Sequence, residues 1–241
     1  MKIITTKIVI LGDCFVGKSS ILDRYINCKF LNNYRATLGL NFLTHDIITS
    51  NTHYIIHLWD TAGSERFRSI NTLFYRNAEA CILVFDLTNY QSFSNISYWY
   101  DEFLINRTPN KPSEFPFVLI GNKSDLINDN ELINKENEMR ENINSNYDEL
   151  LSYNPMFYKG IVNERMIENF CKEKKIKYFS VSAKNNENIK DAIDYIINSA
   201  IKRVNGNNND DYEFNEISIS DVNKGIISKI YSDNNNKCYC F

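Results

Sequence analysis

The chain has 241 residues, of which 43% are hydrophobic and 24% charged, so it is long enough for one domain with a substantial core but short for two. Its 27 basic residues are slightly outnumbered by 30 acidic ones, which removes the usual electrostatic basis for nucleic-acid binding, and we expect no nucleic-acid partner. Six cysteines without a C-x2-C pair and the absence of any run approaching 18 apolar residues argue against a disulfide scaffold, a zinc site and a membrane-spanning helix.

The first third of the chain alternates between strand and helix patterns. Residues 3–11 are apolar and β-branched and lead into a glycine, which predicts a strand, and residues 18–27 have apolar side chains at helical spacing. Residues 41–49 and 53–59 are two further strand-like runs joined by a short polar turn. They predict a hairpin, and therefore an antiparallel pair at the edge of a sheet.

The later segments continue this alternation. Residues 81–85, 117–120 and 177–181 are continuous apolar runs, which is typical of strands covered on both faces. Helical patterns lie at residues 92–105, 162–174 and 188–204. We therefore expect a single α/β domain over residues 1–204, with a doubly wound, mostly parallel six-stranded sheet and one antiparallel edge strand. Residues 128–159 and 205–241 are polar and low in complexity, and predict an insertion and a flexible tail.

A phosphate-binding motif, G-x-x-x-x-G-K-[ST], follows the first predicted strand and leads into the first helix. In that setting, backbone N–H groups and the helix N-terminus face phosphates, the lysine adds a positive charge, and the serine hydroxyl binds Mg²⁺. The alternative, an ordinary glycine-rich turn, fits this context poorly. The residues expected at the phosphates are Gly12, Asp13, Cys14, Phe15, Val16, Gly17, Lys18, Ser19 and Ser20.

An Asp-x-x-Gly segment follows the strand that ends at Trp59. At the carboxyl end of a strand beside a phosphate loop, Asp60 can hold Mg²⁺, and the N–H of Gly63 can meet a γ-phosphate. Alone, the segment has another interpretation, in which the aspartate caps the next helix.

Two further segments indicate a guanine base. Asp125 of Asn122-Lys123-Ser124-Asp125 can accept hydrogen bonds from N1–H and the 2-amino group of guanine, whereas adenine has no matching donors. The stem of Lys123 can cover the base and Asn122 can tie the loops together. Ser182-Ala183-Lys184, after the last strand, can supply a backbone N–H to the guanine oxygen.

These four motifs, in this order, resemble those of the Ras-like small GTPases, which are P-loop NTPases, over nearly all of residues 2–204. Residues 34–42, 59–67, 74–78 and 83–88 are similar to the signature segments of the Rab family. Residues 89–126 are most similar to its late-endosomal and vacuolar branch. The resemblance implies a GTP/GDP switch that uses Mg²⁺ and acts on that membrane route.

The resemblance also implies residue roles. Thr37 would contact both Mg²⁺ and the γ-phosphate, Tyr34 would lie at the nucleotide, and Ser19, Thr37 and Asp60 would form the metal site. Loss of the γ-phosphate would release residues 31–42 and 60–76, and partner proteins would distinguish the two resulting states. Three aromatic residues would present the effector face, with plain core packing as the alternative: Phe42, Trp59 and Phe74.

Three features depart from the family pattern. Ser64 stands where the family has the glutamine that orients the attacking water, so the catalytic set would be Ser64, Lys18 and Thr37, with slow intrinsic hydrolysis. Cys14 and Phe15 occupy loop positions usually taken by small residues. Asn122 and Ser182 are 60 residues apart, where about thirty is usual, so residues 128–159 read as an inserted solvated loop or, alternatively, a partner-binding element.

The chain ends in Cys238-Tyr239-Cys240-Phe241, which fits C-a-a-X with a terminal phenylalanine and predicts geranylgeranylation of Cys238 and Cys240. The alternative is unmodified tail thiols. The tail has three basic and six acidic residues, so it lacks a basic patch that could serve as a second membrane signal.

The sequence thus favours a monomeric, prenylated Rab-type GTPase on the cytoplasmic face of endosomal or vacuolar membranes, cycling with the cytosol. Its expected partners are effectors, an exchange factor, a GTPase-activating protein, a prenylation escort and a GDP-dissociation inhibitor. A GTP-locked interaction module with negligible turnover is the second reading. A small-metabolite kinase is a third, but it leaves residues 122–125 and the tail cysteines unexplained.

Overall fold

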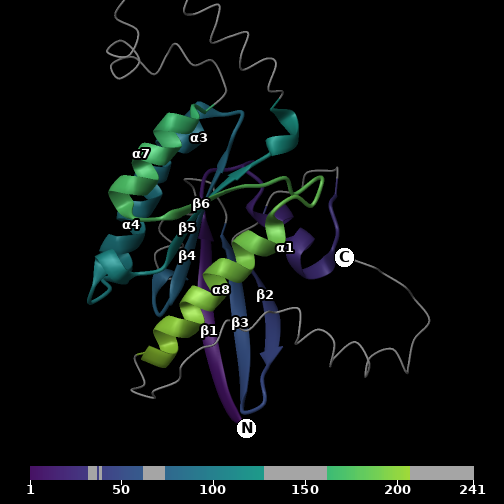
Figure 1. The fold of residues 1–241 in the computed structure, drawn as a ribbon, viewed down its shortest axis with the longest axis vertical. Coiled ribbons are helices and arrows are strands. Elements are labelled where there is room, and N and C mark those ends of the chain that lie inside the picture. Colours follow the sequence, from purple (N-terminus) through teal and green to yellow (C-terminus); the bar gives the residue numbers. More distant parts are fainter. Residues whose placement is uncertain (32–36, 38–39, 62–73, 128–161, 207–241) are drawn as a thin grey trace, which may run out of the picture.

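A six-stranded sheet forms the centre of the domain in the computed structural model, which describes residues 1–31, 37, 40–61, 74–127 and 162–206 (Figure 1). The strands lie in the order β2-β3-β1-β4-β5-β6. All neighbouring pairs are parallel except β2 and β3, so the predicted α/β fold with one antiparallel edge strand is confirmed. The strands are β1 (Lys2–Leu11), β2 (Leu40–Ile48), β3 (Thr52–Thr61), β4 (Ala80–Asp86), β5 (Phe117–Asn122) and β6 (Lys177–Ser180).

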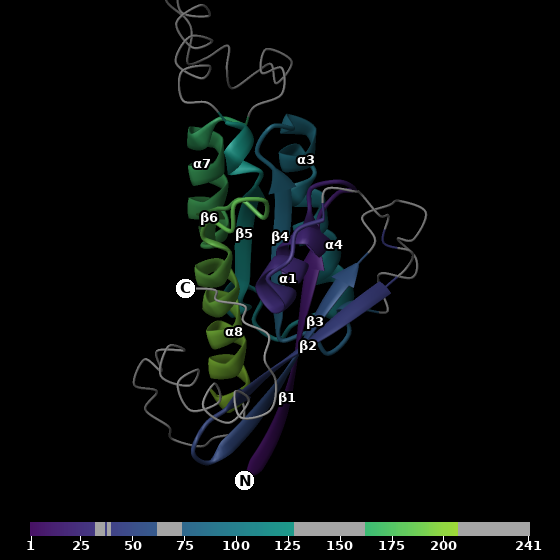
Figure 2. The same cartoon turned by 90° about the vertical axis from the view of Figure 1, so that its right-hand side faces the viewer.

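Helices cover both faces of the sheet (Figures 1 and 2). On one face, α1 (Lys18–Asn27) and α8 (Ile189–Gly206) bury a cluster of mainly aliphatic side chains against β1, β3, β4 and β5. On the other, α3 (Tyr90–Ser94), α4 (Ile96–Arg107) and α7 (Glu164–Lys174) enclose a second cluster that is rich in aromatic rings. These two cores explain why the central strands read as continuous apolar runs.

The strand register brings the sequence motifs to one edge of the sheet. Ile10 pairs with Asp60, Leu11 with Leu83, and Gly121 with Ser180. The carboxyl ends of these parallel strands are therefore level with one another, and the loops that follow them meet there. In parallel α/β sheets this edge is the usual place for a ligand.

The helix expected over residues 92–105 is instead two consecutive helices. It starts earlier than expected, at Tyr90, because the side chain of Asn89 accepts hydrogen bonds from the N–H groups of Gln91 and Ser92 and caps α3. Asn95 separates α3 from α4. Apolar spacing continues across that junction, so periodicity alone does not reveal it.

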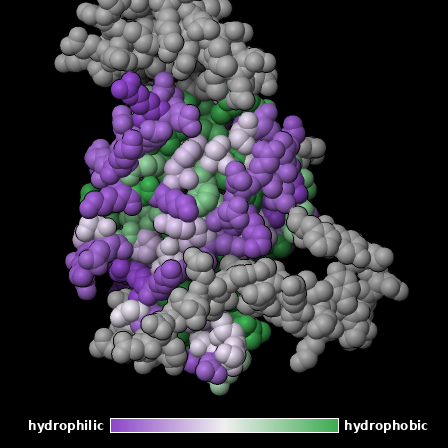
Figure 3. Space-filling model, viewed as in Figure 1, coloured by the Kyte–Doolittle hydropathy of each residue, from purple (hydrophilic) through white to green (hydrophobic). Residues whose placement is uncertain are grey.

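Hydrophilic side chains dominate the face that carries α8, with hydrophobic ones showing between them (Figure 3). The inward side of α8 is apolar, since seven of its residues are buried: Ile189, Ala192, Ile193, Ile196, Ile197, Ala200 and Ile201. Within the described ranges, no helix is both long enough and apolar enough to cross a membrane.

Candidate nucleotide site

The loop between β1 and α1 requires glycine at two positions. Gly12 has φ +144°, and a Cβ there would lie 2.1 Å from the main-chain oxygen of Val84. Gly17 has φ +97°, and a Cβ there would lie 2.2 Å from Nδ2 of Asn122. Because Gly17 is the N-cap of α1 and has no side chain, the first N–H groups of that helix are left for an anion. These constraints are those of a phosphate cradle rather than of an ordinary turn.

Lys18 lies inside this cradle. Its side chain is buried, and Nζ donates hydrogen bonds to the main-chain oxygens of Gly12 at 2.9 Å and Asp13 at 2.8 Å. Burial lowers the pKa of Lys18, while the negative charge of Asp60 opposes that shift. The ammonium group is therefore held by the loop itself, at the place where phosphate oxygens would meet it.

Three oxygen atoms from distant parts of the chain meet beside the cradle. Ser19 Oγ donates to Asp60 Oδ2 at 2.5 Å and lies 2.8 Å from Thr37 Oγ1. Asp60 is 1% exposed, and among the described residues its Oδ1 has no hydrogen-bond partner. Burial is the largest influence on this carboxyl group and raises its pKa. A hard cation that takes oxygen ligands and leaves room for phosphate oxygens, such as Mg²⁺, fits this set.

The residues expected at the base are also brought together. Asp125 Oδ1 accepts a hydrogen bond from Ser182 Oγ at 2.6 Å, and Lys184 Nζ lies 3.8 Å from Asp125 Oδ2. The N–H of Ser182 donates to Glu187 and that of Ala183 to Asn122 Oδ1, so both bond within the protein. The Ser182 hydroxyl therefore holds the Asp125 carboxylate, whereas the motif had suggested only a backbone role for this segment.

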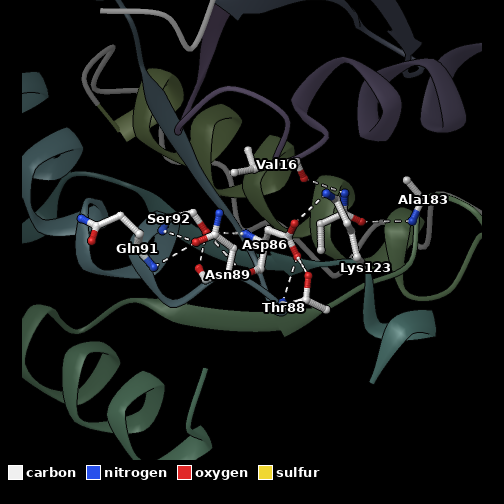
Figure 4. Close-up of polar contacts among 9 residues, drawn as sticks. Val16, Asp86, Thr88, Asn89, Gln91, Ser92, Lys123 and Ala183 are labelled. Atoms are coloured by element: carbon white, nitrogen blue, oxygen red, sulfur yellow. Dashed lines mark hydrogen bonds and ion pairs between the residues drawn. The ribbon is translucent and has the colours of Figure 1, made fainter. Parts of the chain in front are cut away.

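Lys123 is fixed by a residue that the sequence reading missed. It has a left-handed backbone, with φ +69°, and its Nζ lies 2.6 Å from Asp86 Oδ2 (Figure 4). The other carboxylate oxygen of Asp86 accepts bonds from the N–H and hydroxyl of Thr88. Asp86 is buried at the end of β4, and an acidic residue directly after an apolar run is the signal that could have found it.

The three aromatic residues expected at the effector face lie in a row. The ring centres of Phe42 and Trp59 are 6.2 Å apart, and those of Trp59 and Phe74 are 5.6 Å apart. Phe42 is 57% exposed, which is unlike a core residue. Lys7 Nζ lies 3.7 Å from the centre of the Trp59 ring and donates to the main-chain oxygen of Arg76. Burial lowers the pKa of Lys7 to about 8.

The atypical loop residues Cys14 and Phe15 sit at the rim of the cradle. Phe15 has φ +66° and is 64% exposed, and Cys14 is half-buried. The remaining expected site residues, Tyr34, Gly63, Ser64, Cys238 and Cys240, lie outside the described part of the chain, as does the segment 128–159.

The family model described as "Ras family" matches residues 7–202. The chain is 38% identical over 197 residues to Ras-related protein Rab7 of Cenchrus ciliaris, covering 81% of this chain and 82% of the relative. It is 37% identical over 201 residues to the Ypt/Rab-type GTPase avaA of Emericella nidulans, covering 83% and 84%. It is 36% identical over 206 residues to Ras-related protein Rab-7a of Dictyostelium discoideum, covering 85% and 87%.

Proposed function

The chain belongs to the Rab branch of the Ras family of small GTPases, and from that premise we propose that it is a slowly hydrolysing switch of late-endosomal and vacuolar traffic. As a member of this family it binds GTP or GDP with Mg²⁺ and hydrolyses GTP. Rab7-like relatives support the trafficking route. The hydrolysis rate, the residue roles and the membrane anchor are the proposed part.

One observation carries the switch: Thr37 Oγ1 lies 2.8 Å from Ser19 Oγ, beside the buried Asp60. Ser19 and Asp60 belong to fixed elements, α1 and β3, whereas Thr37 belongs to no helix or strand. A contact of Thr37 with the metal and the γ-phosphate would therefore attach this connecting segment to the nucleotide only in the GTP state. Release of that contact after hydrolysis gives partners two states to distinguish.

The chemistry needs no covalent nucleophile. Lys18 holds a positive charge where the polyphosphate binds, and the N–H groups of the loop and of α1 orient it. Bound Mg²⁺ would supply further charge neutralisation, held by Ser19, Thr37 and Asp60. Asp125, at the opposite end of the nucleotide site, selects guanine. Binding of that base then positions the phosphates at Lys18.

Slow hydrolysis is expected because the serine side chain at position 64 is too short to orient water as glutamine does. Ser64→Gln should raise single-turnover GTP hydrolysis about fivefold. An unchanged rate would show that Ser64 is not what limits the reaction.

The exposed ring of Phe15 at the loop rim supports the second interpretation, a GTP-locked module. Phosphate release measured with and without an activating protein separates the two, because a locked module releases none in either case.

The C-terminal Cys238 and Cys240 are the proposed sites of two geranylgeranyl groups, which would anchor the protein to the cytoplasmic face of its membrane and allow cycling with the cytosol. Effectors, an exchange factor, a GTPase-activating protein, a prenylation escort and a GDP-dissociation inhibitor are the proposed partners of a monomer. Cell fractionation tests the anchor: Cys238→Ser with Cys240→Ser should make the protein wholly soluble, and membrane retention would contradict it.

A further inference from the structure

Asp13 places a carboxylate in a loop whose purpose is to bind anions. A negative charge there would repel the polyphosphate if it faced the cradle. It does not: Asp13 Oδ1 accepts a hydrogen bond from Trp99 Nε1 at 2.8 Å, and Oδ2 accepts one from Asn95 Nδ2 at 2.7 Å. Trp99 lies on α4 and Asn95 is the N-cap of α4. Both carboxylate oxygens are thus bonded to the helical layer that lies across the sheet from α1.

The two donors are fixed by packing that does not involve the nucleotide. Trp99 is 1% exposed and belongs to the aromatic core cluster. Asn95 stands at the junction of α3 and α4, and its Oδ1 accepts a hydrogen bond from Gln91 Nε2 at 3.1 Å, which orients the amide. The junction that divides the expected single helix is therefore the place where that helical layer reaches the phosphate loop.

Asp13 is also held through its main chain, whose oxygen accepts the 2.8 Å hydrogen bond from Lys18. Its carboxylate is fixed on one side by α4 and its carbonyl on the other by the lysine of the cradle. Hydrogen bonds to a charged acceptor are among the stronger ones in proteins, so two of them stabilise the carboxylate and fix its direction.

We propose that Asp13 is a positioning residue: Trp99 and Asn95 turn its charge away from the nucleotide and hold the phosphate loop in its binding shape. This inference rests on the proposed nucleotide site. It explains how an acidic residue is tolerated beside a polyphosphate. It also makes the α3–α4 junction a determinant of how long the nucleotide stays bound.

The test is a mutant cycle on the full chain, with release of fluorescently labelled GDP and of a labelled non-hydrolysable GTP analogue as the readout. Asn95→Ala frees one carboxylate oxygen and should speed release about tenfold, more for the GTP analogue because it carries more negative charge. Combined with Asp13→Ala, the same Asn95→Ala change should have almost no effect, since no carboxylate remains. Trp99→Phe should behave as Asn95→Ala does. Asn106→Ala, a matched control that removes an exposed amide on α4 bonded to the main-chain oxygen of Glu102, should leave release unchanged.

An Asn95→Ala effect of equal size with and without Asp13 would overturn the proposal, because Asn95 would then act through the helix alone. A second readout needs no nucleotide: the NMR signal of the Trp99 indole N–H should shift on Asp13→Ala, and an unchanged signal would also overturn it. Failure of the proposed function looks different, since the wild-type protein would then bind no guanine nucleotide while the indole signal still reported the Asp13 contact.

Discussion

The side-chain amide of Asn122 donates a hydrogen bond of 2.9 Å to the main-chain oxygen of Val16, 106 residues earlier in the chain. Its own oxygen accepts a bond of 3.2 Å from the N–H of Ala183. Asn122 is 2% exposed, so water does not replace either bond. One buried amide therefore joins the phosphate loop to the two loops that we propose contact the base, which makes the proposed site a single unit rather than two.

Replacing Asn122 by alanine removes this joint. The change leaves the Val16 oxygen and the Ala183 N–H without their partner inside the protein, at a cost of about 2 kcal/mol in stability. Affinity for GDP should fall about tenfold or more, because the phosphate and base loops are no longer held in register. Titration calorimetry and thermal unfolding measure the two effects. Ser124→Ala, which removes an exposed hydroxyl two residues away, is the control and should change neither.

Asp60→Asn separates stability from metal binding. Burial raises the pKa of Asp60, so folding of the metal-free protein disfavours the charged form of this carboxyl group, whose Oδ1 has no hydrogen-bond partner among the described residues. Removing the charge should stabilise the metal-free, nucleotide-free protein by about 1 kcal/mol. The same change should weaken Mg²⁺-dependent nucleotide binding severalfold. Thermal unfolding with a chelator, beside GDP binding across a Mg²⁺ titration, measures both; a stability loss in the chelator would contradict this account.

Lys7 should titrate in a range where ordinary lysines do not. Burial lowers its pKa to about 8, below the usual 10.5, so its ammonium loses a proton as the pH passes 8. The Trp59 ring then loses a cation 3.7 Å from its centre, and Trp59 fluorescence should change with a midpoint near pH 8. Trp99→Phe isolates the Trp59 signal, and adding Lys7→Met should abolish the transition.

The lowered pKa of Lys7 also makes the free energy of unfolding depend on pH, in a direction that can be stated. Between pH 8 and 10.5 the unfolded chain keeps a proton on Lys7 that the folded protein has lost, so this lysine contributes increasing stability as the pH rises through that window. Relative to Lys7→Met, the wild-type protein should therefore gain stability from pH 8 to pH 10. A constant difference would show that Lys7 keeps an ordinary pKa.

The sequence predicted most of the fold because the residue pattern of each segment agrees with the place that the segment takes in the sheet. Residues 81–85 and 117–120 are continuously apolar, and the structure buries β4 and β5 completely between two helical layers. The phosphate loop was predictable because Gly12 and Gly17 occupy backbone conformations and spaces that exclude other side chains. Ser19, near the start of α1, and Asp60, near the end of β3, were expected to lie at the same edge of the sheet, and the structure places Ser19 Oγ 2.5 Å from Asp60 Oδ2.

What could not be predicted depends on side chains that meet across the fold. The link of Asp86 to Lys123 and that of Asp13 to Trp99 join residues 37 and 86 positions apart, and no periodicity encodes such a pairing. The junction at Asn95 was missed because apolar spacing continues across it, and its bond to Asp13 joins residues 82 positions apart. The hydroxyl of Ser182 was assigned no role because its partner, Asp125, lies 57 residues earlier.

The most direct test of the account is a competition between nucleotides for the wild-type site and for Asp125→Ala. If Asp125, oriented by Ser182, reads the donor edge of guanine, GTP should displace labelled GDP from the wild-type protein at a concentration about a thousandfold below that of ATP. In Asp125→Ala that gap should almost vanish, while the Mg²⁺ dependence of the residual binding persists. Equal displacement by ATP and GTP in the wild-type protein, or an unchanged gap in the variant, would contradict the account.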